Sequence, residues 1–164
     1  MSARLPLTIV GAIIMFVSLL FPTLYCYIND KFFGVEIQGS FFYWIYGNLF
    51  TWIEKEDALG NTYTTTYINF RPDILGLICM LIIIVGGILA LVLGCATESK
   101  AAFIGGIFGI AGMIIFYVGV LMASPLTRLA ELTEAGYFFI PFIGFFICIA
   151  GSILALVGGT LEKY

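Results

Sequence analysis

The sequence contains no histidine and few charged residues, and both shortages restrict what the chain can do. Without histidine, haem and most catalytic zinc or copper sites lose their usual ligand. The sequence also shows no glycine loop of the kind that cradles phosphates and no nucleophile elbow. We therefore expect that the protein is not an enzyme and has no catalytic residue, cofactor or metal.

Charged residues make up 10% of the 164 residues, whereas a soluble domain has about 25%. The chain is instead 62% hydrophobic, with a mean hydropathy of +1.11. A membrane-spanning helix needs roughly 20 apolar residues. Four stretches without Asp, Glu, Lys or Arg meet this length, at residues 5–25, 74–95, 101–123 and 137–160. The sequence therefore predicts a single-domain, all-α integral membrane protein, folded as a left-handed four-helix transmembrane bundle.

Small residues recur along these four stretches at helical spacing. In a membrane, close approach of backbones through such residues supplies much of the attraction between helices. We expect these glycines to pack helices together, and an alternative for the GxxxG pair at 105 and 109 is a homodimer face. The predicted packing glycines are Gly87, Gly105, Gly109, Gly112, Gly144 and Gly151.

The four cysteines all lie in the apolar stretches or at their ends, at positions 26, 79, 95 and 148. This placement favours small packing residues over a disulfide framework or a metal site. Cys95 is also placed where juxtamembrane palmitoylation could occur. Both interpretations of Cys95 stay open.

Residues 26–73 combine charged side chains with many aromatic ones, so this segment is polar enough to leave the bilayer and apolar enough to fold. β-Type composition predicts a small antiparallel sheet of three to five strands, with strands at 24–28, 33–37, 41–45 and 62–68. A short outer helix is predicted at 125–135, since Ser124, Pro125 and Gly136 suit its two ends. The acidic group Glu54, Glu56 and Asp57 could bind a cation, although a solvated turn is the simpler interpretation.

The charge distribution across the predicted spans gives an orientation. The side with both termini has a net charge of +1 and the side with residues 26–73 has −4, which together give the net charge of −3. The count of Lys and Arg discriminates poorly between the two sides. We expect a multi-pass protein of the cell membrane with both termini cytoplasmic and residues 26–73 extracellular.

Some residues resemble a known family. Pro22 near the end of the first span, Gly47-Asn48-Leu49-Phe50 in the long loop and Arg71 before the second span resemble the claudin and peripheral myelin protein group. In that group the first loop is a small β-sheet with a Gly-Leu-Trp type motif, which Gly47, Leu49 and Phe50 or Trp52 would occupy here. The motif of the group continues into two cysteines, and no cysteine lies between 27 and 78. The resemblance implies adhesion, a paracellular barrier or membrane organisation.

Together these features predict a structural, adhesion or membrane-organising protein that acts through its first extracellular loop. Its partners would be membrane lipid and a protein, either a second copy or a larger complex, and neither nucleic acid nor a small-molecule substrate is indicated. The alternatives are an accessory subunit of a respiratory or oxidising membrane complex and an oligomeric channel of the paracellular type. Aromatic residues are common at the centres of interfaces, and the predicted interaction residues are Trp44, Tyr46, Gly47, Leu49, Phe50 and Trp52.

Overall fold

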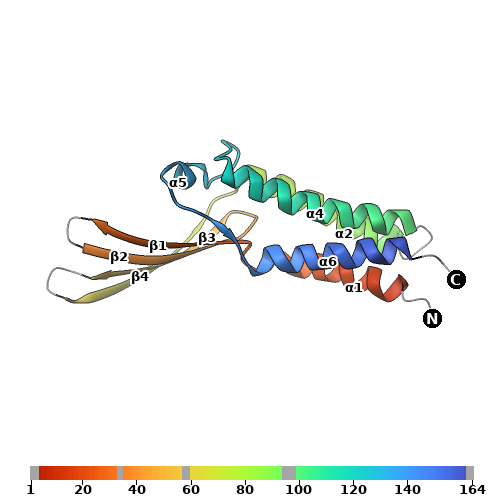
Figure 1. The fold of residues 1–164 in the computed structure, drawn as a ribbon, viewed down its shortest axis with the longest axis horizontal. Coiled ribbons are helices and arrows are strands. Elements are labelled where there is room, and N and C mark those ends of the chain that lie inside the picture. Colours follow the sequence, from red (N-terminus) through yellow and green to blue (C-terminus); the bar gives the residue numbers. More distant parts are fainter. Residues whose placement is uncertain (1–3, 33–34, 57–59, 94–98, 162–164) are drawn as a thin grey trace.

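The computed structural model describes residues 4–32, 35–56, 60–93 and 99–161. Helices gather at one end of the molecule and a β-sheet extends from the other, with strands and helices running along the same long axis (Figure 1). The elements, in order, are α1 (Arg4–Ser18), β1 (Leu24–Phe32), β2 (Val35–Tyr43), β3 (Asn48–Glu56), β4 (Thr62–Phe70), α2 (Ile74–Ile88), the π-helical turn η1 (Leu89–Leu93), α4 (Ser99–Leu121), α5 (Ala130–Glu134), β5 (Ile140–Pro141) and α6 (Ile143–Thr160).

The predicted all-α, four-helix transmembrane bundle is wrong. Within the described residues, three helices are long and apolar enough to cross a membrane: Ile74–Val92, Lys100–Leu121 and Ile143–Thr160. The 15 residues of α1 rise only about 22 Å, which is less than the roughly 30 Å of a hydrocarbon core. A five-stranded antiparallel sheet forms the rest of the fold, so that the class is mixed α and β.

The first predicted span, residues 5–25, fails because its last part is not helical. After Ser18 the backbone continues in tight turns, and the N–H groups of Leu19 and Leu20 donate to carbonyls three residues earlier. Pro22 has no N–H and disfavours a helical residue before it, so the chain leaves the helix there. Leu24 then pairs with Tyr43 in the sheet. A continuous apolar run does not by itself distinguish a helix from a buried strand.

The sheet has the strand order β4-β3-β2-β1-β5, with β4 and β5 at its edges. The strands predicted at 33–37 and 41–45 both overlap one strand, β2, which ends at Tyr43, and residues 33–34 lie outside the described residues. The strand β3 was not predicted. The edge strand β5 comes from the stretch 137–160, which was predicted to be helical throughout. Since Tyr25 of β1 pairs with Ile140, α6 begins only at Ile143.

The predicted packing glycines lie where helices cross. A Cβ atom added to Gly105 of α4 would collide with the carbonyl oxygen of Gly86 in α2, and one added to Gly109 would collide with Ser152 of α6. The GxxxG pair therefore contacts two neighbouring helices of the same chain. The remaining predicted glycines meet close neighbours as well: Gly87 the ring of Phe16, Gly112 the side chain of Ile83, Gly144 the carbonyls of Phe21 and Pro22, and Gly151 the carbonyl of Gly11.

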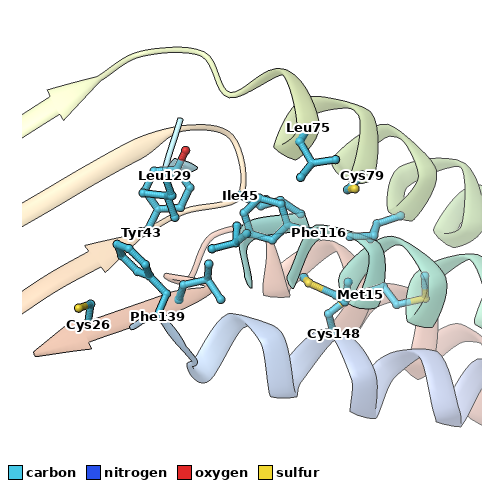
Figure 2. Packing of buried hydrophobic residues seen from close by; sticks show 14 of the residues in the cluster. Met15, Cys26, Tyr43, Ile45, Leu75, Cys79, Phe116, Leu129, Phe139 and Cys148 are labelled. Atoms are coloured by element: carbon cyan, nitrogen blue, oxygen red, sulfur yellow. The ribbon is translucent and has the colours of Figure 1, made fainter. Parts of the chain in front are cut away.

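The buried core continues from the helices into the sheet. Tyr43 of β2 stacks on Phe116 of α4, with ring centroids 6.4 Å apart and an interplanar angle of 8°. Figure 2 shows these two rings and Ile45 where the sheet meets the helices. Leu129 and Phe139, which flank α5, are buried against the same cluster. The sheet and the helical layer thus share one buried core.

The outer helix predicted at 125–135 is shorter in the structure, because α5 contains only Ala130–Glu134. The α4 helix ends at Leu121, and Ala123 follows with a positive φ of 48°. Residues 124–129 form turns in which the N–H of Leu126 donates to Ser124 Oγ at 3.4 Å. Gly136 has φ of 92°, a conformation that favours glycine after the last helical turn.

Candidate functional site

Asp73 is the centre of a buried polar junction between the sheet and the helices. Its side chain is 1% exposed, and it caps α2 by accepting from the N–H of Gly76 at 2.8 Å. The other carboxylate oxygen, Oδ2, accepts from the Tyr43 hydroxyl at 2.6 Å and from Thr127 Oγ1 at 2.8 Å. The backbone N–H of Arg128 donates to the same atom at 3.1 Å. One carboxylate therefore connects β2, α2 and the segment after α4.

The guanidinium of Arg128 extends this junction to the edge of the sheet. Its Nη1 donates to the carbonyl of Gly47 at 3.1 Å and to that of Asn69 at 3.2 Å. Gly47 has φ of 101°, and a Cβ atom there would collide with the carbonyl of Arg71. Gly47, predicted as an interaction residue, thus lies in the tight turn that the arginine holds.

Burial raises the pKa of the Tyr43 hydroxyl, and the charge of Asp73 and the hydrogen bond to it raise this pKa further. The positive charge of Arg128 acts in the opposite direction and lowers it. The net shift is upward, so the Tyr43 hydroxyl keeps its proton and donates a hydrogen bond to Asp73. The junction connects the sheet to the helices through this hydrogen bond.

A groove of about 600 Å³ lies beside the junction, between β3 and the α5 region. Leu49 lines it from the sheet, and Arg71 and Arg128 face it together with Glu131 and Glu134. Two basic and two acidic side chains balance in charge. The formal charges of the side chains that line the groove therefore sum to zero.

The other predicted interaction residues do not form an exposed patch. Trp44, Tyr46, Leu49, Phe50 and Trp52 are all half-buried, and Gly47 is buried. The indole N–H of Trp44 donates to the carbonyl of Leu20 at 3.1 Å. The rings of Phe42 and Phe50 lie 6.1 Å apart, and those of Tyr46 and Phe70 lie 6.4 Å apart. These aromatic residues mostly pack within the sheet and at its junction with the helices.

The exposed apolar side chains of the sheet are concentrated on β4, which contributed no predicted site residue. Tyr63 is 57% exposed, Tyr67 58%, Ile68 74% and Phe70 62%. The strand contains no charged residue along its nine positions. The signal in the sequence was an uncharged run of Thr and Tyr between polar turns, which predicted a strand at 62–68 but not its position at the edge.

Three cysteines, Cys26, Cys79 and Cys148, are free and buried. Cys95 and Asp57 lie outside the described residues, so the structure adds nothing on lipidation or on the complete acidic group. Glu56 is exposed and Glu54 is half-buried. Among the residues that the structure describes, no group of three or more acidic or cysteine side chains could hold a metal ion.

Comparison with known proteins assigns the chain to no family. No family model matches the sequence, and no curated protein matches it significantly. The resemblance to the claudin and peripheral myelin protein group stays an expectation from a few residues.

Proposed function

We propose that the protein is a non-enzymatic integral membrane protein with a structural, adhesion or membrane-organising role, and that it acts by contact through the sheet of residues 24–70. The observation that carries this proposal is the uncharged edge strand β4, with four large apolar or aromatic side chains more than half exposed. Tyr63 and Tyr67 lie on one face of the strand and Ile68 and Phe70 on the other, so apolar side chains flank the open edge on both faces. An uncharged edge strand of this kind is typical of a site where another chain pairs. The partner is a protein rather than a small molecule, since the exposed groups lie on a strand and not in a cavity.

The proposal includes the orientation in the cell membrane. The sheet lies outside the cell, and the opposite end of the helical layer, with both termini, faces the cytoplasm. In this arrangement α1 reaches only part of the way across, and the turns at 19–23 carry the chain on to the sheet. The first turn of α1 and the last turn of α6 lie together at the end remote from the sheet (Figure 1), which supports this arrangement. A cysteine introduced by Thr64→Cys in intact cells should react with a membrane-impermeant maleimide. Protection of this position until the cells are opened would contradict the orientation.

Photo-crosslinking in the native membrane tests the contact. A photoreactive residue at position 67 on β4 should capture a protein, whereas the same residue at position 114 should capture lipid alone. Ile114 is a matched control because its side chain is exposed on α4, a candidate span. Protein captured from position 114 and none from position 67 would contradict the proposal. That result would favour an accessory subunit that packs sideways through its helices.

A further inference from the structure

The β4 strand is a long edge that lacks the usual protection against pairing. It pairs with β3 over nine residues, and no described strand lies along its other side. Edge strands are usually shortened, bulged, or given charges or proline to prevent pairing with another chain. The opposite edge, β5, is only two residues long. Thr62–Phe70 contains neither charge nor proline, so β4 is free to accept another strand.

The register identifies which backbone groups of β4 are free. The N–H of Arg71 donates to the carbonyl of Gly47, which continues the β3–β4 ladder by one step. Residues in an antiparallel ladder alternate between pairs that exchange hydrogen bonds and pairs that do not. Odd-numbered residues of β4 therefore bond toward β3. Thr62, Thr64, Thr66 and Ile68 direct their N–H and carbonyl groups toward the open edge.

The sequence of this edge is nearly the same in both directions. Residues 61–69 are Asn-Thr-Tyr-Thr-Thr-Thr-Tyr-Ile-Asn, and the symmetry is broken only by Thr62 opposite Ile68. An antiparallel pair of identical strands with its two-fold axis at Thr65 therefore places like residues opposite each other. Closed two-fold interfaces require this kind of self-complementary surface.

We propose that β4 pairs antiparallel with β4 of a second copy, centred on Thr65, so that the two sheets become one. This inference rests on the proposed contact function and names the partner. Thr64 of one copy exchanges hydrogen bonds with Thr66 of the other, because both direct their backbone groups toward the edge. Tyr63 faces Tyr67 in a non-hydrogen-bonded pair, where side chains approach most closely. Because β4 has no charged residue, the pair places no like charges directly opposite each other on the two β4 strands.

The direction of β4 decides where the second copy lies. The strands run along the helix axes, and β4 leads directly toward the start of α2 (Figure 1). Antiparallel pairing therefore places the two helical layers at opposite ends of the joined sheet, as in two apposed membranes. Copies side by side in one membrane would instead run their β4 strands in parallel. In the proposed register, Phe70 of one copy lies about 34 Å along the strands from Phe70 of the other.

Disulfide trapping between vesicles tests both the register and the geometry. Two vesicle populations carry the full chain with different tags and are mixed before mild oxidation. With Thr65→Cys we expect a disulfide joining the two tags, since the two positions meet at the axis with a separation that a disulfide can bridge. Thr66→Cys is the matched control, because it is the neighbouring threonine and pairs with position 64 instead. The unmodified chain reports any background from the native cysteines.

A disulfide at position 65 between chains that carry different tags, with none at position 66, would support the proposal. Trapping at position 66, at both positions equally, or at neither would overturn the register. Trapping only between chains of one vesicle population would overturn the apposed-membrane geometry.

Charge pairing at the axis gives a second, independent test. Thr65→Lys or Thr65→Glu places like charges opposite each other, and clustering of vesicles with a single variant should fall at least about tenfold. Mixing Thr65→Lys vesicles with Thr65→Glu vesicles should restore clustering, because the charges are then opposite. A failure to fold cannot produce this rescue.

The two proposals can fail separately. If the unmodified protein clusters vesicles but the position 65 variants behave like it, contact through the sheet stands and the edge pairing is wrong. If position 67 captures a protein in native membranes while purified vesicles never cluster, the partner is a different protein and self-pairing is wrong. If position 67 captures no protein, the contact function itself is wrong.

Discussion

The helical layer and the β4 edge both expose apolar side chains, but the exposure has a different meaning in each. Ile114 and Ile115 of α4 are exposed on a helix that can cross a membrane, where hydrocarbon covers them. Ile68 and Tyr67 are more exposed than either, on a sheet that extends beyond the helices. A helix pairs the N–H and carbonyl groups of its own backbone, whereas an edge strand leaves those groups unpaired along one side. In the proposed assembly, lipid covers the helical surface and another strand pairs with β4.

The junction around Asp73 joins these two regions, and its loss should have the largest effect. Asp73→Ala leaves three buried donors and one partly buried donor without their acceptor. We expect the free energy of unfolding to fall by about 3–5 kcal/mol. Denaturant unfolding in detergent measures this loss, and the exposed Glu134 provides the control through Glu134→Ala. An unchanged midpoint for Asp73→Ala would mean that the junction does not hold the sheet on the helices.

Within the helical layer, a larger residue at a helix crossing should have the next largest effect. Gly105→Leu forces α4 away from Gly86 and Ala90 of the preceding helical segment, and overpacking of this kind costs about 1–3 kcal/mol. The lipid-facing Ile104→Leu should change stability little. Thermal unfolding of both variants measures the contrast, and equal midpoints would contradict the assigned packing.

The junction should also give the protein a specific sensitivity to high pH. The pKa of Tyr43 is higher in the folded state than in the unfolded chain. Neutral Tyr43 therefore makes its full contribution to the free energy of unfolding below the ordinary tyrosine pKa of about 10. Above that value the unfolded chain loses this proton first, and stability should fall by about 1.4 kcal/mol per pH unit. Unfolding between about pH 8 and 11 should show a steeper fall for the unmodified protein than for Tyr43→Phe. Equal slopes would contradict this role of Tyr43.

The smallest effect on folding is expected at the edge. Tyr67→Ser should change stability by no more than about 0.5 kcal/mol, because more than half of the side chain is exposed. The same variant should weaken vesicle clustering. A large loss of stability, or clustering equal to that of the unmodified protein, would remove the contrast between the two regions.

Much of the helical layer could be predicted from the sequence. Uncharged apolar runs predicted the three helices that can span a membrane. Such runs predict helices because a long apolar segment has few other stable conformations in lipid. The same rule failed for residues 5–25 and 137–160 at one end each, since Leu24 and Ile140 are apolar in strands as well as in helices. The interaction residues chosen for their aromatic rings are half-buried, because composition does not indicate which face of a strand is covered.

Two features required the tertiary structure. Asp73 is an ordinary helix cap in the sequence, and only the fold brings it to Tyr43 and Thr127, which are distant along the chain. Likewise, the strand order alone places β4 at the edge and leaves its near-symmetric sequence unpaired. The sequence by itself determined the apolar helices and the β-forming composition of residues 62–70, because hydrophobicity and propensity are local properties. Which polar group is buried and which strand is left open depends on the packing of distant segments, and this only the tertiary structure decided.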